Sequence, residues 1–330
     1  MSIVQEAAEA IRGKNLRIVY PEGTDARILR AAVRHAKDGI LHPIVLGPKD
    51  EVEALAEKEG VSLEGLDFID YEHYEDYDAM LQALLERRKG KIDETKAHKM
   101  LKDRNYFGTM LVYMGKADGM VSGADGPTGD TIRPGLQIIK TKPDAKLVSG
   151  CFIMISPDEK ERLLFADSAV NISPSEEELA DIAYQTAETA KVFHIEPNVA
   201  MLSFSTYGSA SSPEQEKVAK ATEIAKKNYP NLNVDGEMQL DAAWDETVAK
   251  KKAPGSNVAG KARVFIFPDL QAGNIGYKIA QRLGNYTALG PLLQGMAKPV
   301  NDLSRGCSEQ DAYEIGIITA YQNVILSRIF

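Results

Sequence analysis

Short runs of apolar residues alternate along this chain with longer stretches that have the periodicity of amphipathic helices. The apolar runs have the length and composition of buried strands. Strands are predicted at residues 16–20, 44–46, 119–122, 146–155, 162–166, 198–203 and 263–267. Because strands that alternate with helices usually form parallel sheets, the pattern predicts an α/β fold.

Three helix starts carry capping signals. Ser173 and Ser212 are each followed by proline, which is typical of a helix start because serine accepts a hydrogen bond from a free backbone N–H and proline has no N–H to satisfy. Ser308 and Asp311 have the serine-x-x-acid spacing of a capping box. We therefore expect helices to begin after Ser173, Ser212 and Ser308.

Length and composition narrow the class of protein. A chain of 330 residues with 44% hydrophobic content most often forms two domains, at roughly 150 residues each. The net charge of −9 argues against a nucleic-acid or membrane-surface partner. The two cysteines, Cys151 and Cys307, form no disulfide framework, and neither a signal peptide nor an apolar run of about 18 residues is present. We expect a cytoplasmic protein.

Common cofactor and metal motifs are missing from the sequence. The five histidines show no HExxH spacing, and no GxxxxGK[ST] or GxGxxG stretch occurs. These absences argue against a zinc hydrolase, a P-loop ATPase and a Rossmann dinucleotide enzyme. The sequence therefore predicts a site without a metal or a prosthetic group.

Three loops rich in glycine and hydroxyl groups follow predicted strands, at residues 121–134, 203–212 and 267–278. Such loops meet at the carboxyl edge of a parallel sheet, where ligands bind. Their N–H groups and hydroxyls suit phosphate oxygens, although each loop alone could be an ordinary turn. The predicted substrate-binding residues from these loops are Thr128, Thr131, Ser205, Thr206, Ser209 and Gly276.

The segment 301–311 contains a hydroxyl, a guanidinium, a thiol and a carboxylate close to a predicted helix start. Ser304 and Arg305 would lie in the loop, and Asp311 would lie in the first helical turn. An anionic ligand suits such a place because the helix N-terminus and the arginine are both positive. Asp311 could also be no more than the acid of the capping box.

Several of these stretches together resemble the phosphate acetyltransferase family in its short form, and the resemblance covers nearly the whole chain. The segments that carry it are residues 118–124, 130–141, 204–210, 267–278 and 299–308. The resemblance implies reversible acetyl transfer between acetyl phosphate and coenzyme A, with acetyl-CoA and phosphate as the other substrate pair. It implies no cofactor beyond coenzyme A as a substrate, and a homodimer.

The resemblance also implies a domain plan. Two α/β domains with largely parallel sheets would enclose an interdomain cleft, in an architecture similar to that of the isocitrate/isopropylmalate dehydrogenases. The first domain would comprise residues 1–145 plus 292–330, and the second residues 146–291. The sequence pattern alone predicts two domains without this discontinuous division.

Residue by residue, the family's catalytic segment corresponds to Ser304, Arg305 and Asp311. Its cleft arginine corresponds to Arg133, and its third-loop asparagine to Asn274. A further arginine linked to coenzyme A falls at Arg87 or Arg88, where the pairing with the next lysine favours Arg88.

This chain departs from the family pattern at two places. It has Gly126-Pro127 where relatives commonly carry a histidine and a hydroxyl pair, and Tyr207 replaces a frequent lysine. Both changes concern substrate affinity and acyl preference more than the class of reaction.

The expected mechanism is direct attack of the coenzyme A thiolate, with Asp311 as the base, Ser304 and Arg305 stabilising negative charge, and Arg133 holding phosphate. Free thiol and carboxyl pKa values near 8.5 and 3.9 differ by roughly 4.6, which costs about 6 kcal/mol for full proton transfer. Neighbouring arginines and partial burial would have to reduce this gap. A covalent route through an acetylated Cys307 is the alternative.

Three other functions fit parts of the sequence. A phosphate butyryltransferase, or an enzyme for another acyl length, would keep most of these segments. A regulatory module that binds acetyl-CoA without catalysis is similar to domains fused to malic enzymes. A metal-dependent hydroxyacid dehydrogenase would share the two-domain plan, but it needs clustered aspartates that the sequence does not show.

Overall fold

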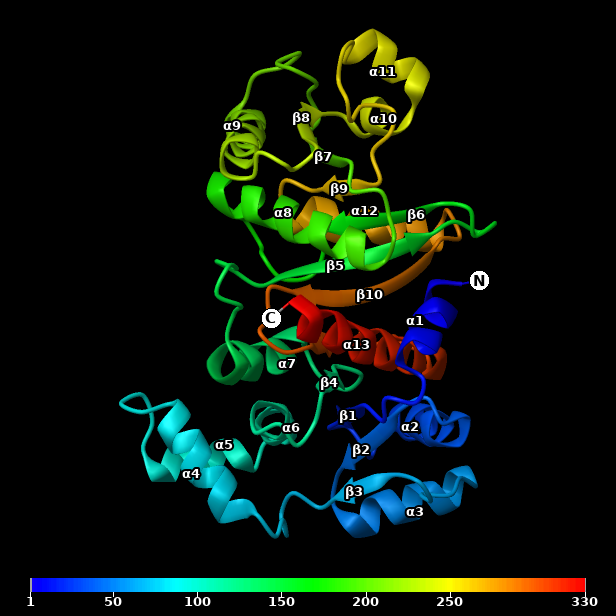
Figure 1. Ribbon diagram of the computed structural model, residues 1–330, viewed down its shortest axis with the longest axis vertical. Helices are drawn as coiled ribbons and strands as arrows, with labels where there is room; N and C mark the ends of the chain where they lie inside the picture. Colours follow the sequence, from blue (N-terminus) through cyan, green and yellow to red (C-terminus); the bar gives the residue numbers. More distant parts are fainter. Residues whose placement is uncertain (1, 330) are drawn as a thin grey trace. The chain divides into compact units, whose positions relative to one another are not determined.

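The computed structural model describes residues 2–329 (Figure 1). The chain divides into two compact units, Met1–Lys142 with Met296–Phe330 and Pro143–Gly295. Each unit has helices packed on a sheet whose strands run largely parallel. The predicted α/β fold class is therefore confirmed. None of the helices within residues 2–329 is long and apolar enough to cross a membrane.

The first unit contains a parallel sheet with the strand order β11-β4-β1-β2-β3. Its strands are β1 Arg17–Tyr20, β2 His42–Leu46, β3 Asp67–Ile69, β4 Gly119–Ser122 and β11 Val300–Asp302. Its helices are α1 Ile3–Ile11, α2 Ala26–Asp38, α3 Lys49–Glu59, α4 Tyr77–Arg87, α5 Glu94–Leu101, α6 Arg104–Tyr113, α7 Thr128–Pro134, the π-helix η1 Gly135–Ile139, and α13 Glu309–Ile329.

Helices pack on both faces of this sheet, so its strands are buried on both sides (Figure 1). Alternate strand residues face opposite helices. On one face, a side chain at Gly108 of α6 would come within 2.9 Å of Met120 and 3.2 Å of Val19. On the other face, a side chain at Gly119 would come within 2.8 Å of Thr319 in α13. Glycine thus allows close helix packing on each face.

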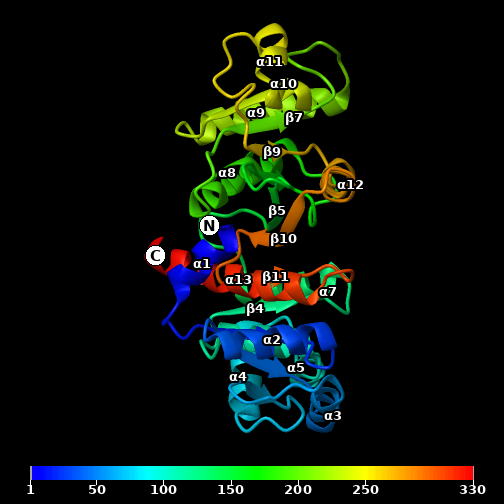
Figure 2. The same ribbon diagram turned by 90° about the vertical axis from the view of Figure 1, so that its right-hand side faces the viewer.

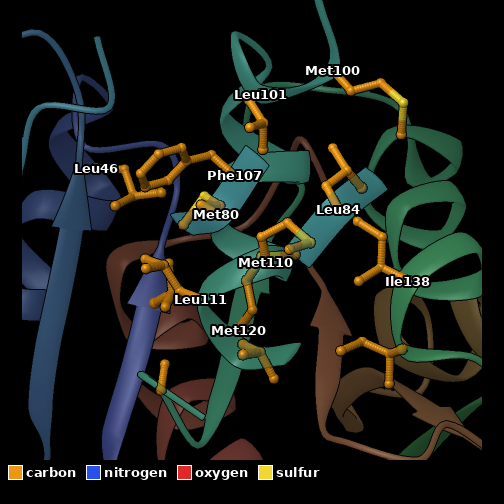
Figure 3. Close-up of a cluster of buried hydrophobic side chains, with 14 of the residues drawn as sticks. Leu46, Met80, Leu84, Met100, Leu101, Phe107, Met110, Leu111, Met120 and Ile138 are labelled. Carbon is orange, nitrogen blue, oxygen red and sulfur yellow. The ribbon is translucent and has the colours of Figure 1, made fainter. Parts of the chain in front are cut away.

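The apolar core beside α6 joins the sheet to the helices α4 and α5 (Figure 3). Leu46 and Met120 from the strands meet Met80, Leu84 and Phe107 from the helices, all fully buried. Burial of such a side chain contributes roughly 1.5–3 kcal/mol. This core fixes α6 and the end of β4, from which the loop 123–127 starts.

The second unit contains a sheet with the order β10-β5-β6-β9-β7-β8. The strands β6, β9, β7 and β8 pair in parallel, β5 pairs antiparallel with β6, and β10 pairs antiparallel with β5. Its strands are β5 Ser149–Ile155, β6 Arg162–Ala166, β7 Val199–Leu202, β8 Val234–Met238, β9 Val264–Ile266 and β10 Thr287–Gln294. Its helices are α8 Glu176–Val192, α9 Pro213–Asn228, α10 Leu240–Trp244, α11 Glu246–Lys252 and α12 Leu270–Arg282. Figure 2 shows α8 and α12 on opposite sides of these strands.

The predicted strands all occur, with boundaries that differ by at most three residues. Ser212 caps α9 and is followed by Pro213 at the first helical position, as expected. The prediction for Ser173 is wrong, because α8 begins two residues later with Ser175 as its cap. Ser173 and Glu176 have the same serine-x-x-glutamate spacing, but it is Ser175 and Glu178 that form the complete capping box.

Candidate active site

The carboxyl ends of β1, β4 and β11 lie side by side at one edge of the first sheet. The buried carboxylate of Glu22, which follows β1, accepts hydrogen bonds from the N–H groups of Gly123, Ala124 and Asp125 at 3.0, 2.9 and 2.9 Å. Gly123 has a φ of 109°, and a side chain there would lie 2.2 Å from the Asp302 carboxylate. The loop after β4 is thus held by one acid and packed against another.

Arg27 of α2 connects two loops at this edge, the loop after β4 and the loop 303–308. Its Nη1 donates to the carbonyl oxygens of Arg305 and Cys307, both at 2.9 Å, and its Nη2 donates to the carbonyl oxygen of Ala124 at 2.8 Å. An ion pair with Asp25 orients the guanidinium. Because Arg27 binds main-chain oxygens, it fixes the path of the loop 303–308 whichever side chains this loop carries.

Asp311 occupies the capping position that the sequence predicts. Its carboxylate accepts hydrogen bonds from the backbone N–H and the hydroxyl of Ser308 at 2.7 and 2.9 Å, and the Ser308 hydroxyl accepts from the Asp311 N–H at 3.1 Å. The capping box at the start of α13 is therefore confirmed. Asp311 remains partly exposed, so the same carboxylate can also meet a ligand.

Ser304 and Arg305 are exposed on the loop between β11 and α13. The Ser304 hydroxyl accepts a hydrogen bond from the Gly306 N–H at 3.2 Å, which leaves its own proton free to donate. No residue within 2–329 forms a hydrogen bond or an ion pair with the Arg305 guanidinium. Both side chains can therefore turn toward an anionic ligand.

Arg133 and Arg88 lie near one another around Tyr106. Burial raises the pKa of Tyr106, whereas the positive charges of Arg133 and Arg88 lower it, so both guanidiniums lie within electrostatic reach of this phenol. Arg133 is 62% exposed and has only a distant ion pair with Asp130, at 3.7 Å. The sequence predicted both arginines, and the structure places them in the same part of the first unit.

The guanidiniums of Arg87 and Arg88 differ in the hydrogen bonds that they make. Arg87 donates to the carbonyl oxygens of Ile138 and Ile139 at 2.6 and 3.1 Å. Arg88 makes one long hydrogen bond, to the Gln137 carbonyl at 3.4 Å, and its buried Nε has no partner among the described residues. Arg87 has a structural role, and Arg88 keeps donors for a ligand.

Thr128 and Thr131 of α7 face the buried Asp302 at the end of β11. The Thr128 hydroxyl donates to Asp302 Oδ2 at 2.7 Å. The buried Thr131 hydroxyl has no hydrogen-bond partner within residues 2–329. Both threonines thus lie at the predicted sheet edge, but Thr128 is already bound to a carboxylate.

Cys307 is a poor nucleophile in its surroundings. Burial raises the pKa of the Cys307 thiol to about 11, and the negative charge of Asp311 adds to this rise while the Arg27 guanidinium opposes it. The thiolate is the reactive form of cysteine, and little of it would be present at neutral pH. Burial and the raised pKa of Cys307 therefore argue against its acetylation.

The predicted loop after β7 is present in the second unit and is organised around a buried acid. Glu237 accepts hydrogen bonds from the Gly208 N–H at 2.7 Å and from the Ser205 hydroxyl at 3.2 Å. The Thr206 N–H donates to the Ser209 hydroxyl at 3.1 Å. Ser209 is exposed, whereas Ser205 and Thr206 are buried, so Ser209 is the hydroxyl of this set that a ligand can reach.

Tyr207, the departure from the family pattern in this loop, points its hydroxyl at the carboxylate of Asp235. Burial and the hydrogen bond to Asp235 raise the pKa of Tyr207 to about 12. Asp235 also accepts from Lys226 at 2.8 Å and from Ser256 at 2.5 Å. The tyrosine therefore anchors the loop and adds no positive charge, whereas the lysine expected from the family resemblance would add one.

The third predicted loop is wrong in its extent, because α12 begins at Leu270 and contains its glycines. These glycines serve packing. A side chain at Gly273 would lie 2.2 Å from the Asp167 carbonyl oxygen, and one at Gly276 would lie 3.0 Å from the Phe267 ring. The Asn274 side chain donates to the Ser168 carbonyl at 3.2 Å and is partly exposed.

Sequence reasoning missed Glu22, Arg27 and Asp302. Glu22 follows the end of β1 and Asp302 is the last residue of β11, positions that could have marked them, but single acids at such places are common. Arg27 acts on main-chain oxygens of segments almost a hundred and almost three hundred residues away, at Ala124 and Arg305. Such a role leaves no local pattern. Within residues 2–329, no three histidine, cysteine or acidic side chains are grouped to hold a metal ion.

Comparison with known proteins identifies the family. Residues 2–320 match the family described as "Phosphate acetyl/butaryl transferase". This chain belongs to that family. It is 55% identical to a phosphate acetyltransferase of Bacillus subtilis (strain 168) over 95% of this chain and 97% of that protein. It is 50% identical to a phosphate acetyltransferase of Staphylococcus epidermidis (strain ATCC 12228 / FDA PCI 1200) over 98% of each.

A solved structure supports the same relationship. The crystal structure of a phosphotransacetylase from Streptococcus pyogenes matches with a TM-score of 0.93 at 54% identity, covering 98% of each chain. At this identity and coverage the likeness extends over both units. The family resemblance predicted from the sequence is confirmed.

Proposed function

We propose that this protein catalyses reversible transfer of an acetyl group between acetyl phosphate and coenzyme A. The observation that carries the proposal is the full-length similarity to phosphate acetyltransferases at 50–55% identity. In the forward direction the coenzyme A sulfur forms a bond to the acetyl carbon, and the bond from this carbon to the phosphate oxygen breaks. The thiol proton leaves to a base and ends on the solvent or the phosphate.

Asp311 is the proposed base. It lies at the first turn of α13, where its carboxylate is fixed by Ser308 and remains partly exposed. A base for this reaction must come within hydrogen-bond reach of the thiol, and a fixed carboxylate loses little orientational freedom when the thiol arrives. Nearby arginines favour the thiolate and thereby ease the proton transfer.

Arg305 and Ser304 are proposed to stabilise the negative charge that develops on the carbonyl oxygen and the phosphate. Arg305 has a guanidinium without a partner in the described part of the chain, and Ser304 has a free hydroxyl proton. Arg27 holds the main chain beside them, so the loop is ordered before the substrate binds. Pre-ordered donors are the arrangement that stabilises a transition state most effectively.

Arg133 and Arg88 are proposed to bind the phosphate groups of the substrates. Arg133 is exposed and weakly paired, which suits the phosphate of acetyl phosphate. Arg88 is half-buried, and its Nη1 makes one long hydrogen bond to the Gln137 carbonyl, which leaves Nη donors for a phosphate of coenzyme A. Thr128 and Thr131 flank the same edge of the sheet. Guanidinium groups are well matched to phosphate because they donate two parallel hydrogen bonds.

The predicted substrate-binding residues of the second unit differ in their accessibility to a substrate. Ser209 is exposed and Asn274 is partly exposed, so both can contact a substrate. Ser205 and Thr206 are buried and support the loop, and Gly276 packs on Phe267. We therefore propose contact roles for Ser209 and Asn274 and supporting roles for the other three residues.

The test of the function is a direct assay of the purified protein. Acetyl phosphate and coenzyme A are mixed without metal or nucleotide, and formation of acetyl-CoA is followed by the absorbance of its thioester. We expect acetyl-CoA and phosphate in equal amounts, with butyryl phosphate a slower substrate. Faster turnover of butyryl phosphate would indicate a butyryltransferase, and acetyl-CoA binding without turnover would indicate a regulatory module.

We also propose a cytoplasmic homodimer. Ile275, Ile279 and Leu283 are spaced by four residues along α12 and its C-cap, and they are 57%, 53% and 78% exposed. Ile172, which is 74% exposed, lies beside the start of this helix through a hydrogen bond to Leu270. Contiguous exposed apolar surface of this kind is typical of a contact between proteins. Two reduced cysteines fit a cytoplasmic location.

The dimer is tested by the mass of the protein in solution. Ile279→Glu places a charge in the middle of the apolar stripe and should yield monomer, whereas Lys278→Glu on the neighbouring face should remain dimeric. Wild-type protein that is monomeric at micromolar concentration would contradict the proposal.

A further inference from the structure

The carboxyl group of Asp302 is buried in an environment that does not satisfy its charge. The residue is 1% exposed, and its Oδ1 has no hydrogen-bond partner among residues 2–329. Its Oδ2 accepts one hydrogen bond, from the Thr128 hydroxyl at 2.7 Å. The nearby Leu303 N–H donates elsewhere, to the Ser122 carbonyl at 2.7 Å. A buried carboxylate with one unpartnered oxygen is costly, so a purely structural position would favour asparagine.

The charged groups around Asp302 differ in sign and distance. Glu22 is the nearest acid, and its carboxylate is satisfied by three backbone N–H groups of the loop after β4. The Arg104 guanidinium lies 3.7 Å from the Glu22 carboxylate and forms an ion pair with the Asp125 carboxylate at 3.0 Å. From α7 the facing groups are the hydroxyls of Thr128 and Thr131. None of these groups provides Asp302 with a cation of its own.

Two opposing influences set the protonation of Asp302. Burial raises the pKa of its carboxyl group to about 6, and the negative charge of Glu22 adds to this rise, while the hydroxyls of Thr128 and Thr131 and the N–H of Leu303 lower it. The carboxyl group therefore changes its charge close to neutral pH. Its hydrogen bond with Thr128 is charge-assisted only in the ionised form, and such bonds are about twice as strong as neutral ones.

The position of Asp302 gives this change a consequence. Asp302 ends β11 and directly precedes the loop that carries Ser304 and Arg305. Thr128, its partner, is the first residue of α7, which carries Arg133. The hydrogen bond between Asp302 and Thr128 thus joins the two segments that we assign to phosphate binding and charge stabilisation.

We propose that Asp302 is a positioning residue whose ionised carboxylate holds α7 against the loop 303–308 and so sets the affinity for acetyl phosphate. This inference rests on the proposed function. When Asp302 is protonated, Thr128 and α7 are held less firmly, and the guanidinium of Arg133 is less well placed. Binding of acetyl phosphate should then weaken while coenzyme A binding, assigned to Arg88, is unaffected.

The experiment compares pH profiles from pH 5 to 8 for the wild type, Asp302→Asn, Thr128→Val and the exposed control Glu75→Gln. For the wild type, kcat/KM for acetyl phosphate should fall as the pH drops through a midpoint near 6 and level off at the lower value of the protonated enzyme. Asp302→Asn should lack this fall and show, at every pH, the raised KM for acetyl phosphate of the protonated enzyme. Its KM for coenzyme A should not change.

Thr128→Val and the control separate positioning from a general loss of structure. Removal of the hydroxyl that favours the charged form should move the midpoint to higher pH by roughly 1 unit. Glu75→Gln should follow the wild type. If Asp302→Asn and Thr128→Val both keep the pH profile of the wild type, with its fall at the same midpoint, the inference is overturned.

A second readout does not depend on activity. Infrared difference spectra between the wild type and Asp302→Asn should show one carboxyl group that titrates near pH 6. If the wild-type protein does not transfer acetyl groups, the proposed function fails while this titration can still be observed. If the protein is active but neither the titration nor the altered profile appears, the positioning role of Asp302 alone is refuted.

Discussion

The guanidinium of Arg27 donates hydrogen bonds to the main-chain oxygen of Arg305 at 2.9 Å, although the two residues are 278 positions apart. The same guanidinium binds the Cys307 and Ala124 carbonyl oxygens. One side chain of α2 therefore sets the conformation of the loop that precedes α13. The reactive side chains of this loop depend on a residue that has no proposed contact with either substrate.

Arg27→Lys should lower both stability and activity. Lysine keeps the charge, but it cannot reproduce the planar fork that reaches several carbonyl oxygens at once. Loss of even one charged hydrogen bond of this partly buried side chain costs about 2 kcal/mol, so the unfolding midpoint in urea should fall clearly. The exposed Arg12→Lys serves as the control and should leave stability and kcat unchanged. Wild-type kcat in Arg27→Lys would show that the loop does not need this support.

Cys307→Ala should retain near-normal turnover. The thiol is buried, and its raised pKa of about 11 keeps it protonated at neutral pH. Its one polar contact in the described structure is a distant one, 3.7 Å from Arg27. Steady-state kinetics of the variant, together with mass spectrometry of the wild-type protein mixed with acetyl phosphate, test this. Complete loss of activity with an acetylated wild-type protein would instead establish the covalent route.

The charge of Asp302 should make the protein less stable as the pH rises. The pKa of the folded carboxyl group, about 6, lies above the value of roughly 3.9 for an unfolded aspartate. Between these values the folded state binds more protons, so the free energy of unfolding falls as the pH rises through this window. The full loss, on the order of 3 kcal/mol, is reached above pH 6.

Asp302→Asn should remove this loss. The variant should resemble the wild type at pH 4 and should unfold at higher urea concentration than the wild type at pH 7.5. The difference between the two proteins isolates Asp302 because all other titrating groups are common to both. An equal difference at both pH values would mean that the carboxyl group does not change its charge in this window.

The sequence pattern was sufficient for the elements that depend on local signals. The central strands, the α9 cap at Ser212 and the capping box of Ser308 with Asp311 all follow from short-range spacing. The pattern failed for the strands β3, β8, β10 and β11, which the sequence analysis did not predict, and for the glycines of α12. Gly273 and Gly276 resemble loop residues in the sequence, but they lie in a helix because Asp167 and Phe267 pack against them.

The site could be predicted only in part, because some of its residues depend on contacts with segments that are distant in the sequence. Exposed groups such as Arg305 and Arg133 belong to segments that resemble the family, and the contacts we propose for them are with ligands. Glu22, Arg27 and Asp302 act through backbone groups and hydroxyls of distant segments. Their partners are defined only once the strand order β11-β4-β1 is known.

The role of Asp311 is tested most directly by the ratio of kcat between Asp311→Asn and Ser308→Ala. Both variants weaken the same capping box, which contributes about 1 kcal/mol, but only the first removes the carboxylate. We predict a loss of about 100-fold or more for Asp311→Asn, typical of a lost general base, and a loss of no more than about threefold for Ser308→Ala. Equal losses in the two variants would mean that Asp311 only caps α13, and the proposed mechanism would be wrong.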